Sequence, residues 1–160
     1  MRHVDTGALD QVFFRKLYLG RARIVVCDVY LNQICDDLSA SLTSDSVRVN
    51  FKAILLDIAV DYAVPPGLLT NELVINALKQ CEGSNVAIKV VLTRDEEGYT
   101  LTVSDRGVGM PATFVDDMGT GLGMQVVNLR IRQIGAEIDM PKAGQPAHFR
   151  VRIPNAIIAA

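Results

Sequence analysis

The stretch from Asn71 to Lys79 reads NELVINALK, and it decides how the rest of the chain is interpreted. Glu72 and Asn76 are four residues apart and Lys79 follows three residues later, so at 100° per residue these polar groups share one narrow stripe of a helix. Apolar residues surround the stripe: Leu68, Leu69, Leu73, Val74, Ile75, Ala77 and Leu78. The stripe is either the solvated side of an amphipathic core helix or a set of functional groups, and the pattern alone favours the solvated side.

Two glycine-rich runs downstream strengthen the functional interpretation. Residues 105–109 read DRGVG where a strand is expected to end, and residues 119–123 read GTGLG where a helix is expected to begin. Glycine lets the backbone approach a ligand closely, and the amides at a helix start attract phosphate. Residues 107–112 also fit the dinucleotide fingerprint G-x-G-x-x-A, but Asp105 would place a carboxylate beside the pyrophosphate and too little chain follows for a doubly wound sheet.

Strands and helices are interspersed along the rest of the chain. Apolar residues at helical spacing predict helices over 8–19, 29–42 and 122–134, and a fourth from Pro65-Pro66, after a turn over 61–67, to about residue 80. Alternation predicts strands over 47–52 paired with 54–60, over 86–93 paired with 99–105 through a turn, and over 138–140 and 149–153. This order predicts a two-layer α/β sandwich with a mixed, mostly antiparallel sheet and helices on one face.

Composition limits the kind of protein. The 160 residues are 49% hydrophobic and 21% charged, which is typical of one globular domain, and the net charge of -2 argues against binding nucleic acid by bulk electrostatics. No nucleic acid partner is therefore expected. The longest apolar run, residues 53–60, is too short to span a membrane, and no signal peptide is recognisable, so a cytoplasmic location is expected. Cys27, Cys35 and Cys81 are odd in number and widely spaced, which favours free thiols over a metal site.

Together the three motifs resemble the ATP-binding domain of the superfamily that includes gyrase, the MutL mismatch-repair proteins and bacterial histidine kinases. NELVINALK resembles the asparagine box, residues 105–109 the first glycine box and residues 119–124 the second. Residues 61–69 and 125–138, and the short loop 110–118, look most like histidine kinases of the HWE type. The resemblance implies the Bergerat-type sandwich for residues 25–155, preceded by an N-terminal helix within 1–24 as a remnant of a dimerisation region and followed by a tail at 156–160.

The resemblance also implies ATP and Mg²⁺ as cofactors and gives each site residue a role. Glu72 would be the catalytic residue that orients or deprotonates the attacking group, and Asn76 would help to coordinate Mg²⁺. Lys79 would neutralise phosphate, and Asp105 would accept a hydrogen bond from the adenine amino group. The nucleotide would also be bound by the glycine boxes, which shape a mobile lid: Gly107, Gly109, Gly119, Thr120, Gly121, Leu122 and Gly123.

The implied reaction is transfer of the γ-phosphoryl group of ATP to a histidine, but the acceptor is missing from the chain. His3 is followed by Val-Asp-Thr, and His148 falls on the last strand, so neither lies in the basic helix sequence of these kinases. A histidine-bearing dimerisation domain acting in trans, a response regulator and a homodimer are the expected partners. Ala147 and Gln80 also depart from the family, because many members carry threonine and histidine there. The alternative functions are a nucleotide-binding regulatory module and a serine-kinase anti-sigma factor, both acting by partner docking.

Overall fold

The computed structural model describes residues 24–41, 47–53, 57–79, 86–107, 109–111, 113 and 121–154. The helices in these ranges are α2 (Cys27–Ser41), α3 (Val60–Lys79) and α5 (Leu122–Gln133). The strands are β1 (Ile24–Val26), β2 (Val47–Ala53), β3 (Asp57–Ala59), β4 (Val86–Arg94), β5 (Gly98–Ser104), β6 (Glu137–Asp139) and β7 (His148–Pro154). Within the described ranges, no helix combines the length and the apolar character needed to cross a membrane.

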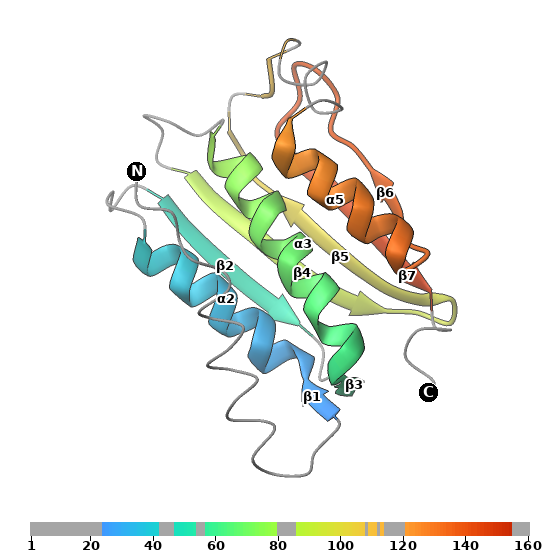
Figure 1. The fold of residues 1–160 in the computed structure, drawn as a ribbon. Helices are drawn as coiled ribbons and strands as arrows, with labels where there is room; N and C mark the ends of the chain where they lie inside the picture. The colour runs from blue at the N-terminus through green and yellow to red at the C-terminus, as the bar shows by residue number, and fades with distance from the viewer. Residues whose placement is uncertain are drawn as a thin grey trace.

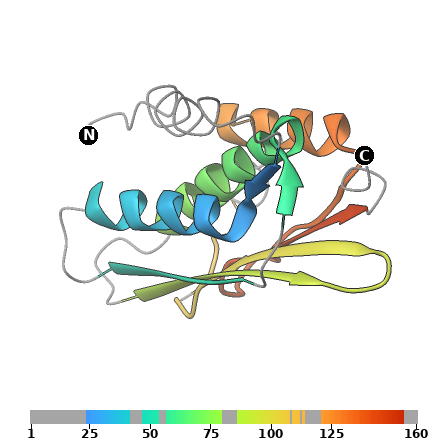
Figure 2. The same ribbon diagram turned by 90° about the horizontal axis from the view of Figure 1, so that it is seen from below.

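Five strands form one sheet in the order β2-β4-β5-β7-β6 (Figure 1). β2 and β4 are parallel, and the other neighbouring pairs are antiparallel. Figure 2 shows α2, α3 and α5 together on one face of this sheet. The predicted two-layer α/β sandwich with a mixed, mostly antiparallel sheet is therefore confirmed.

The core lies between the sheet and the helix layer. Alternate residues of the strands point into it, which is why the sequence shows a period of two. The fully buried strand residues are Ile88, Val90, Leu101, Val103, Phe149 and Val151. The middle helix, α3, contributes Leu69, Leu73, Val74 and Ala77, all with no exposed surface. Because α2 packs on one side of α3, α5 on the other and the sheet beneath, apolar residues surround most of this helix.

One glycine permits the close packing of α2 against α3. A Cβ atom at Gly67 would collide with the ring and hydroxyl of Tyr30, at 2.7 Å from Cζ. Tyr30 is itself buried, so it has little room to move away. Glycine usually weakens a helix, and here the cost is offset because it lets a large aromatic side chain fill the helix interface.

The predicted pairing of residues 47–52 with 54–60 is wrong. β2 pairs in parallel with β4, at a register that sets Val47 opposite Val86, and α3 forms part of the crossover between them. β3 pairs instead with β1, a strand that the sequence analysis did not predict, in a separate two-stranded sheet. Alternation shows which side of a strand is buried, but it carries no information about the neighbouring strand.

The predicted turn over residues 61–67 is also wrong. α3 begins at Val60 and includes Pro65 and Pro66 in its second turn. Pro65 and Pro66 each remove one backbone hydrogen bond without stopping the helix, because the buried apolar side chains beyond them hold the segment in place. The other described helices and the antiparallel β4–β5 hairpin lie where they were predicted to within a few residues. The helix predicted over 8–19 and the proposed dimerisation remnant lie outside the described residues.

Candidate functional site

Three chain segments that carry the sequence motifs meet at one end of the molecule. The C-terminal half of α3, the end of β5 and the start of α5 all lie at the upper end of Figure 1. α3 and α5 pack side by side, so side chains on one helix can reach the first turn of the other. The fold therefore brings the polar stripe of α3 and the flanks of both glycine runs to one place.

Glu72 and Asn76 face the first turn of α5. A Cβ atom at Gly123 would lie 3.0 Å from Glu72 Oε2 and 3.8 Å from Asn76 Oδ1. The amide Nδ2 of Asn76 donates a hydrogen bond to Met124 Sδ at 3.3 Å. Any larger residue at position 123 would push the Glu72 carboxylate aside by a few tenths of an ångström, so the carboxylate and the amide oxygen lie directly beside the backbone of the second glycine run.

The stripe on α3 is not the solvated side of a core helix. Asn76 is only 4% exposed, Glu72 is half-buried, and Lys79, in the last turn, is exposed. Burial raises the pKa of Glu72 above its ordinary value, and the charge of Lys79 and a hydrogen bond from the side chain of Asn71 oppose this shift only in part. A carboxylate whose pKa is shifted toward neutrality is suited to accept a proton from a reacting group.

The start of α5 presents its backbone to this carboxylate and amide. Gly121 is the N-cap in an extended conformation, with no side-chain cap, and the first turn holds no acidic residue. The amides of a helix start without a side-chain cap carry partial positive charge and suit an anionic group. Leu122 is 82% exposed, and its predicted role in binding the nucleotide stays a prediction. Gly119 and Thr120 lie outside the described residues, and their predicted roles stay predictions.

Asp105 lies directly after β5, at the edge of the same region. Its carboxylate Oδ1 accepts a hydrogen bond from the amide of Gly107 at 2.8 Å, and its own amide donates to the carbonyl of Ala147 at 3.0 Å. Ala147 is buried beside it, at a position where many members of the family that the sequence resembles carry threonine. The turn therefore holds the aspartate backbone in a fixed place relative to β7.

The first glycine run is fastened to the loop between β6 and β7. The amide of Met110 donates to the carbonyl of Gln145 at 2.9 Å, and its carbonyl accepts from the amide of Gly144 at 2.8 Å. Gly109 has φ of +100°, and a Cβ there would lie 2.8 Å from the Gly144 backbone, so glycine is required on both counts. Sequence reasoning missed this loop, although Gly144 between Pro141 and Pro146 was a signal for a tight turn.

Comparison with a family model identifies the family of this chain. Residues 61–157, more than half of the chain, match the family described as histidine kinase-, DNA gyrase B-, and HSP90-like ATPase. Among curated proteins, the blue-light-activated histidine kinase 2 of Erythrobacter litoralis (strain HTCC2594) is 28% identical over 136 residues, which are 82% of this chain and 39% of that protein. The chain thus spans about two fifths of that relative.

Solved structures share the fold. The histidine kinase domain of the Erythrobacter litoralis EL346 blue-light activated histidine kinase has a TM-score of 0.82 at 23% identity, over 95% of this chain and 76% of that one. The histidine kinase AdeS of Acinetobacter baumannii has a TM-score of 0.66 at 18% identity, over 94% of this chain and 75% of that one. The resemblance to a histidine kinase ATP-binding domain is therefore confirmed, and the chain belongs to the family of histidine kinase-, DNA gyrase B- and HSP90-like ATPases.

Proposed function

We propose that this chain binds ATP with Mg²⁺ and transfers the γ-phosphoryl group to a histidine on another domain, as the catalytic part of a sensor histidine kinase. The observation that carries the proposal is the approach of Glu72 and Asn76 to Gly123, at the uncapped start of α5. This approach places three kinds of group around one point: the Glu72 carboxylate as the proposed general base, an amide oxygen, and the amides at the helix start. The kinase relatives named above support the same activity.

The side chains of the site fit a magnesium–nucleotide complex. Among the described residues, no group of three or more His, Cys, Asp or Glu side chains is placed to hold a metal alone. Mg²⁺ commonly keeps several waters and takes phosphate oxygens as ligands, so one amide oxygen from Asn76 is a sufficient protein contribution. The ion would neutralise charge on the phosphates, helped by Lys79, while the start of α5 holds phosphate oxygens.

The proposed transfer exchanges one bond to the γ-phosphorus for another. The bond between the γ-phosphorus and the bridging oxygen breaks, a bond from that phosphorus to an imidazole nitrogen forms, and ADP leaves with the bridging oxygen. Glu72 accepts the proton that the imidazole nitrogen loses. The raised pKa of Glu72 brings this carboxylate closer to the basicity at which proton acceptance is efficient near neutral pH. Asp105 would select adenine by accepting a hydrogen bond from its amino group.

The acceptor must come from elsewhere. His148 is exposed on β7 and pairs in register with Ser104, on the sheet face opposite to α3 and α5. We therefore assign the acceptor to a histidine-bearing dimerisation domain, with a response regulator receiving the phosphoryl group next, in the cytoplasm where ATP is supplied. The lack of a phosphoacceptor motif favours one second candidate, a nucleotide-binding module that regulates a partner by docking.

Binding and transfer are tested separately. Calorimetry with ATP, with and without Mg²⁺, is followed by radiolabelled ATP and a separate histidine-bearing dimerisation domain. We expect Mg²⁺-dependent binding and label on histidine. Glu72→Gln should leave ATP affinity within about threefold and slow transfer by about a hundredfold or more, as for loss of a general base. Glu97→Gln, in the exposed turn after β4, is the matched control and should behave as wild type.

The outcomes separate the two candidates. Binding without transfer to any acceptor domain would support the regulatory module and refute the kinase. Absence of ATP binding would refute both. Equal transfer by Glu72→Gln and wild type would refute the role of Glu72 as the base.

A further inference from the structure

The face of the sheet that α2, α3 and α5 leave uncovered has an unusual charge pattern (Figure 2). Alternate strand residues point to this open face, and they include five Lys or Arg side chains but only two carboxylates: Arg48, Lys52, Lys89, Arg150 and Arg152 against Glu137 and Asp139. The rest of the chain therefore holds 11 basic and 16 acidic side chains out of the totals of 16 and 18. A chain of net charge -2 has thus gathered basic groups on one surface.

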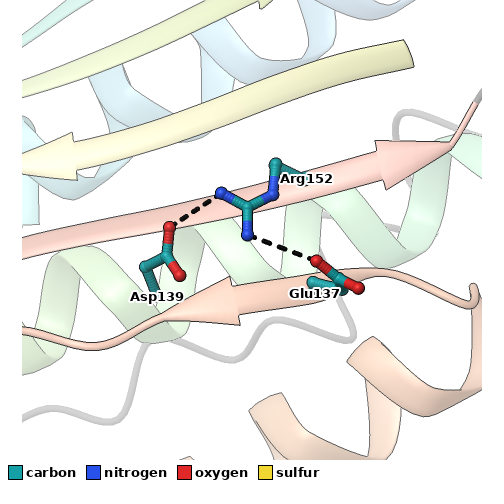
Figure 3. A network of polar contacts seen from close by, with 3 residues as sticks. All are labelled: Glu137, Asp139 and Arg152. Carbon is teal, nitrogen blue, oxygen red and sulfur yellow. Dashed lines mark hydrogen bonds and ion pairs between the residues drawn. The ribbon is translucent and has the colours of Figure 1, made fainter. Parts of the chain in front are cut away.

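Both carboxylates form ion pairs with the same arginine. Arg152 bonds to Asp139 at 2.9 Å and to Glu137 at 3.2 Å, across the β6–β7 pair (Figure 3). The ion pairs are exposed, so they contribute little to stability, but they neutralise the end of the face that carries Arg152. The remaining cations, with His148, form what we call the basic open face: Arg48, Lys52, Lys89, His148 and Arg150.

The register of the strands determines which side chains are neighbours on this face. On β5, Thr100, Thr102 and Ser104 form a strip of small hydroxyl side chains in the middle of the sheet. Lys89 flanks Ser104 from β4, and His148 flanks it from β7. Arg150 lies next to Thr102 on one side and opposite Asp139 on the other, although the carboxylate of Asp139 bonds to Arg152. Because β4 and β7 are two strand spacings apart, their backbones lie about 10 Å apart across the strip, with Arg150 two positions further along it than Lys89.

Those dimensions match an α-helix. A helix with its side chains is about 10–12 Å in diameter, so one lying along β5 would rest on small residues with a cation on each side. Glutamate or aspartate along the two sides of such a helix would meet Lys89 on one side and Arg150 on the other. Lys52 and Arg48, on the neighbouring edge strand β2, extend the positive potential beyond Lys89.

The open face is less suited to other anionic partners. Single-stranded nucleic acid is usually held by aromatic side chains between cations, but Tyr99 and Phe149 point into the core. A membrane surface would favour exposed large apolar anchors beside the cations, and on the described strands the apolar residues of this face are only Ala87, Val91 and Pro154. We propose that the basic open face is a docking surface for an acidic helix of a partner protein, separate from the nucleotide site.

The test uses defined probes and needs no nucleotide. The first probe is a 20-residue helical peptide with glutamates along two opposite sides and alanines elsewhere; a second has the same composition in scrambled order. A thymidine 20-mer and phosphatidylserine vesicles represent the other anionic surfaces. Fluorescence anisotropy or co-sedimentation measures each affinity for wild type, for K89E/R150E, and for R132E/K142E, which makes the same change of charge at exposed sites elsewhere.

We expect wild type to bind the patterned peptide more tightly than the scrambled one, and to lose this binding in about 0.5 M salt. K89E/R150E should weaken it at least about tenfold, since two attractions become repulsions, and R132E/K142E by no more than about twofold. Circular dichroism and ATP affinity should be the same for all three proteins. No peptide binding, equal binding of the scrambled peptide, or equal loss in both double variants would overturn the proposal. Tighter binding of the oligonucleotide or vesicles through Lys89 and Arg150 would overturn it as well.

Discussion

Adding a single methyl group at Gly123 should damage catalysis without damaging the fold. Gly123 lies in the first turn of α5, where alanine fits the helical backbone and stabilises it by up to about 1 kcal/mol relative to glycine. The new Cβ would lie 3.0 Å from Glu72 Oε2, closer than the 3.4 Å at which ordinary contact begins, so the carboxylate must shift by a few tenths of an ångström. A misplacement of about 1 Å in an active site costs on the order of a hundredfold in rate, and we expect Gly123→Ala to slow phosphotransfer about tenfold or more.

Single-turnover transfer from radiolabelled ATP to a separate histidine-bearing dimerisation domain measures the rate, and calorimetric melting measures stability. We expect a melting temperature equal to or above that of wild type together with the slower transfer. Asn128→Ala is the matched control, because it also raises helix propensity in α5 but adds no atom near Glu72. If Gly123→Ala transferred the phosphoryl group at the wild-type rate, the close approach of α5 to Glu72 would not contribute to catalysis. Equal slowing by Asn128→Ala would assign the effect to helix stability instead.

Three further substitutions test the site and the packing around it. Asp105→Asn should weaken ATP binding by about ten- to a hundredfold, because a hydrogen bond to a charged acceptor contributes about 1.5–3 kcal/mol, and unchanged affinity by calorimetry would refute the contact with adenine. Glu72→Gln should raise the melting temperature more at pH 7 than at pH 4. Folding favours the protonated carboxyl of Glu72, so the stability that this group contributes is fully present below the ordinary pKa of 4.5 and is lost as the pH rises through the raised pKa of the folded protein. A difference in melting temperature that does not depend on pH would contradict this. Gly67→Ala should lower the free energy of unfolding in urea by about 1–3 kcal/mol through its clash with Tyr30, and Tyr30→Leu should relieve the added penalty. Additive effects of the two changes would argue against the clash.

Local patterns in the sequence were sufficient for the layers and for the site helix. Burial alternates along β4, β5 and β7 as the sequence predicts, and α5 ends where Gly135 adopts a φ of +61°. The boundary of α3 was missed because Pro65 and Pro66 suggested a start, whereas tertiary packing keeps the turn before them helical. The pairing of β2 was missed because the parallel partner lies beyond α3, and no local pattern reports a non-local neighbour.

The site was predicted as three separate motifs, but its geometry depends on contacts between distant segments. The helical spacing predicts that Glu72 and Asn76 lie on the same side of α3. Only the packing of α3 against α5 shows that this side faces Gly123. The burial of Asn76 was missed for the same reason, since a helical pattern does not show which neighbour covers a polar residue. The support of the first glycine run by Gly144 depends on a turn 35 residues further along the chain.

The hydrogen bonds of Met110 to the β6–β7 loop have a consequence for changes in the length of the chain. They fix where the chain leaves the sheet after the first glycine run, and the packing of α5 on α3 fixes where it returns. Between two fixed points, doubling the number of connecting residues costs only about 0.6 kcal/mol of closure entropy. The number of residues that join these two points can therefore change at little cost in stability, without altering the packing of α3 and α5 that holds Glu72 and Asn76.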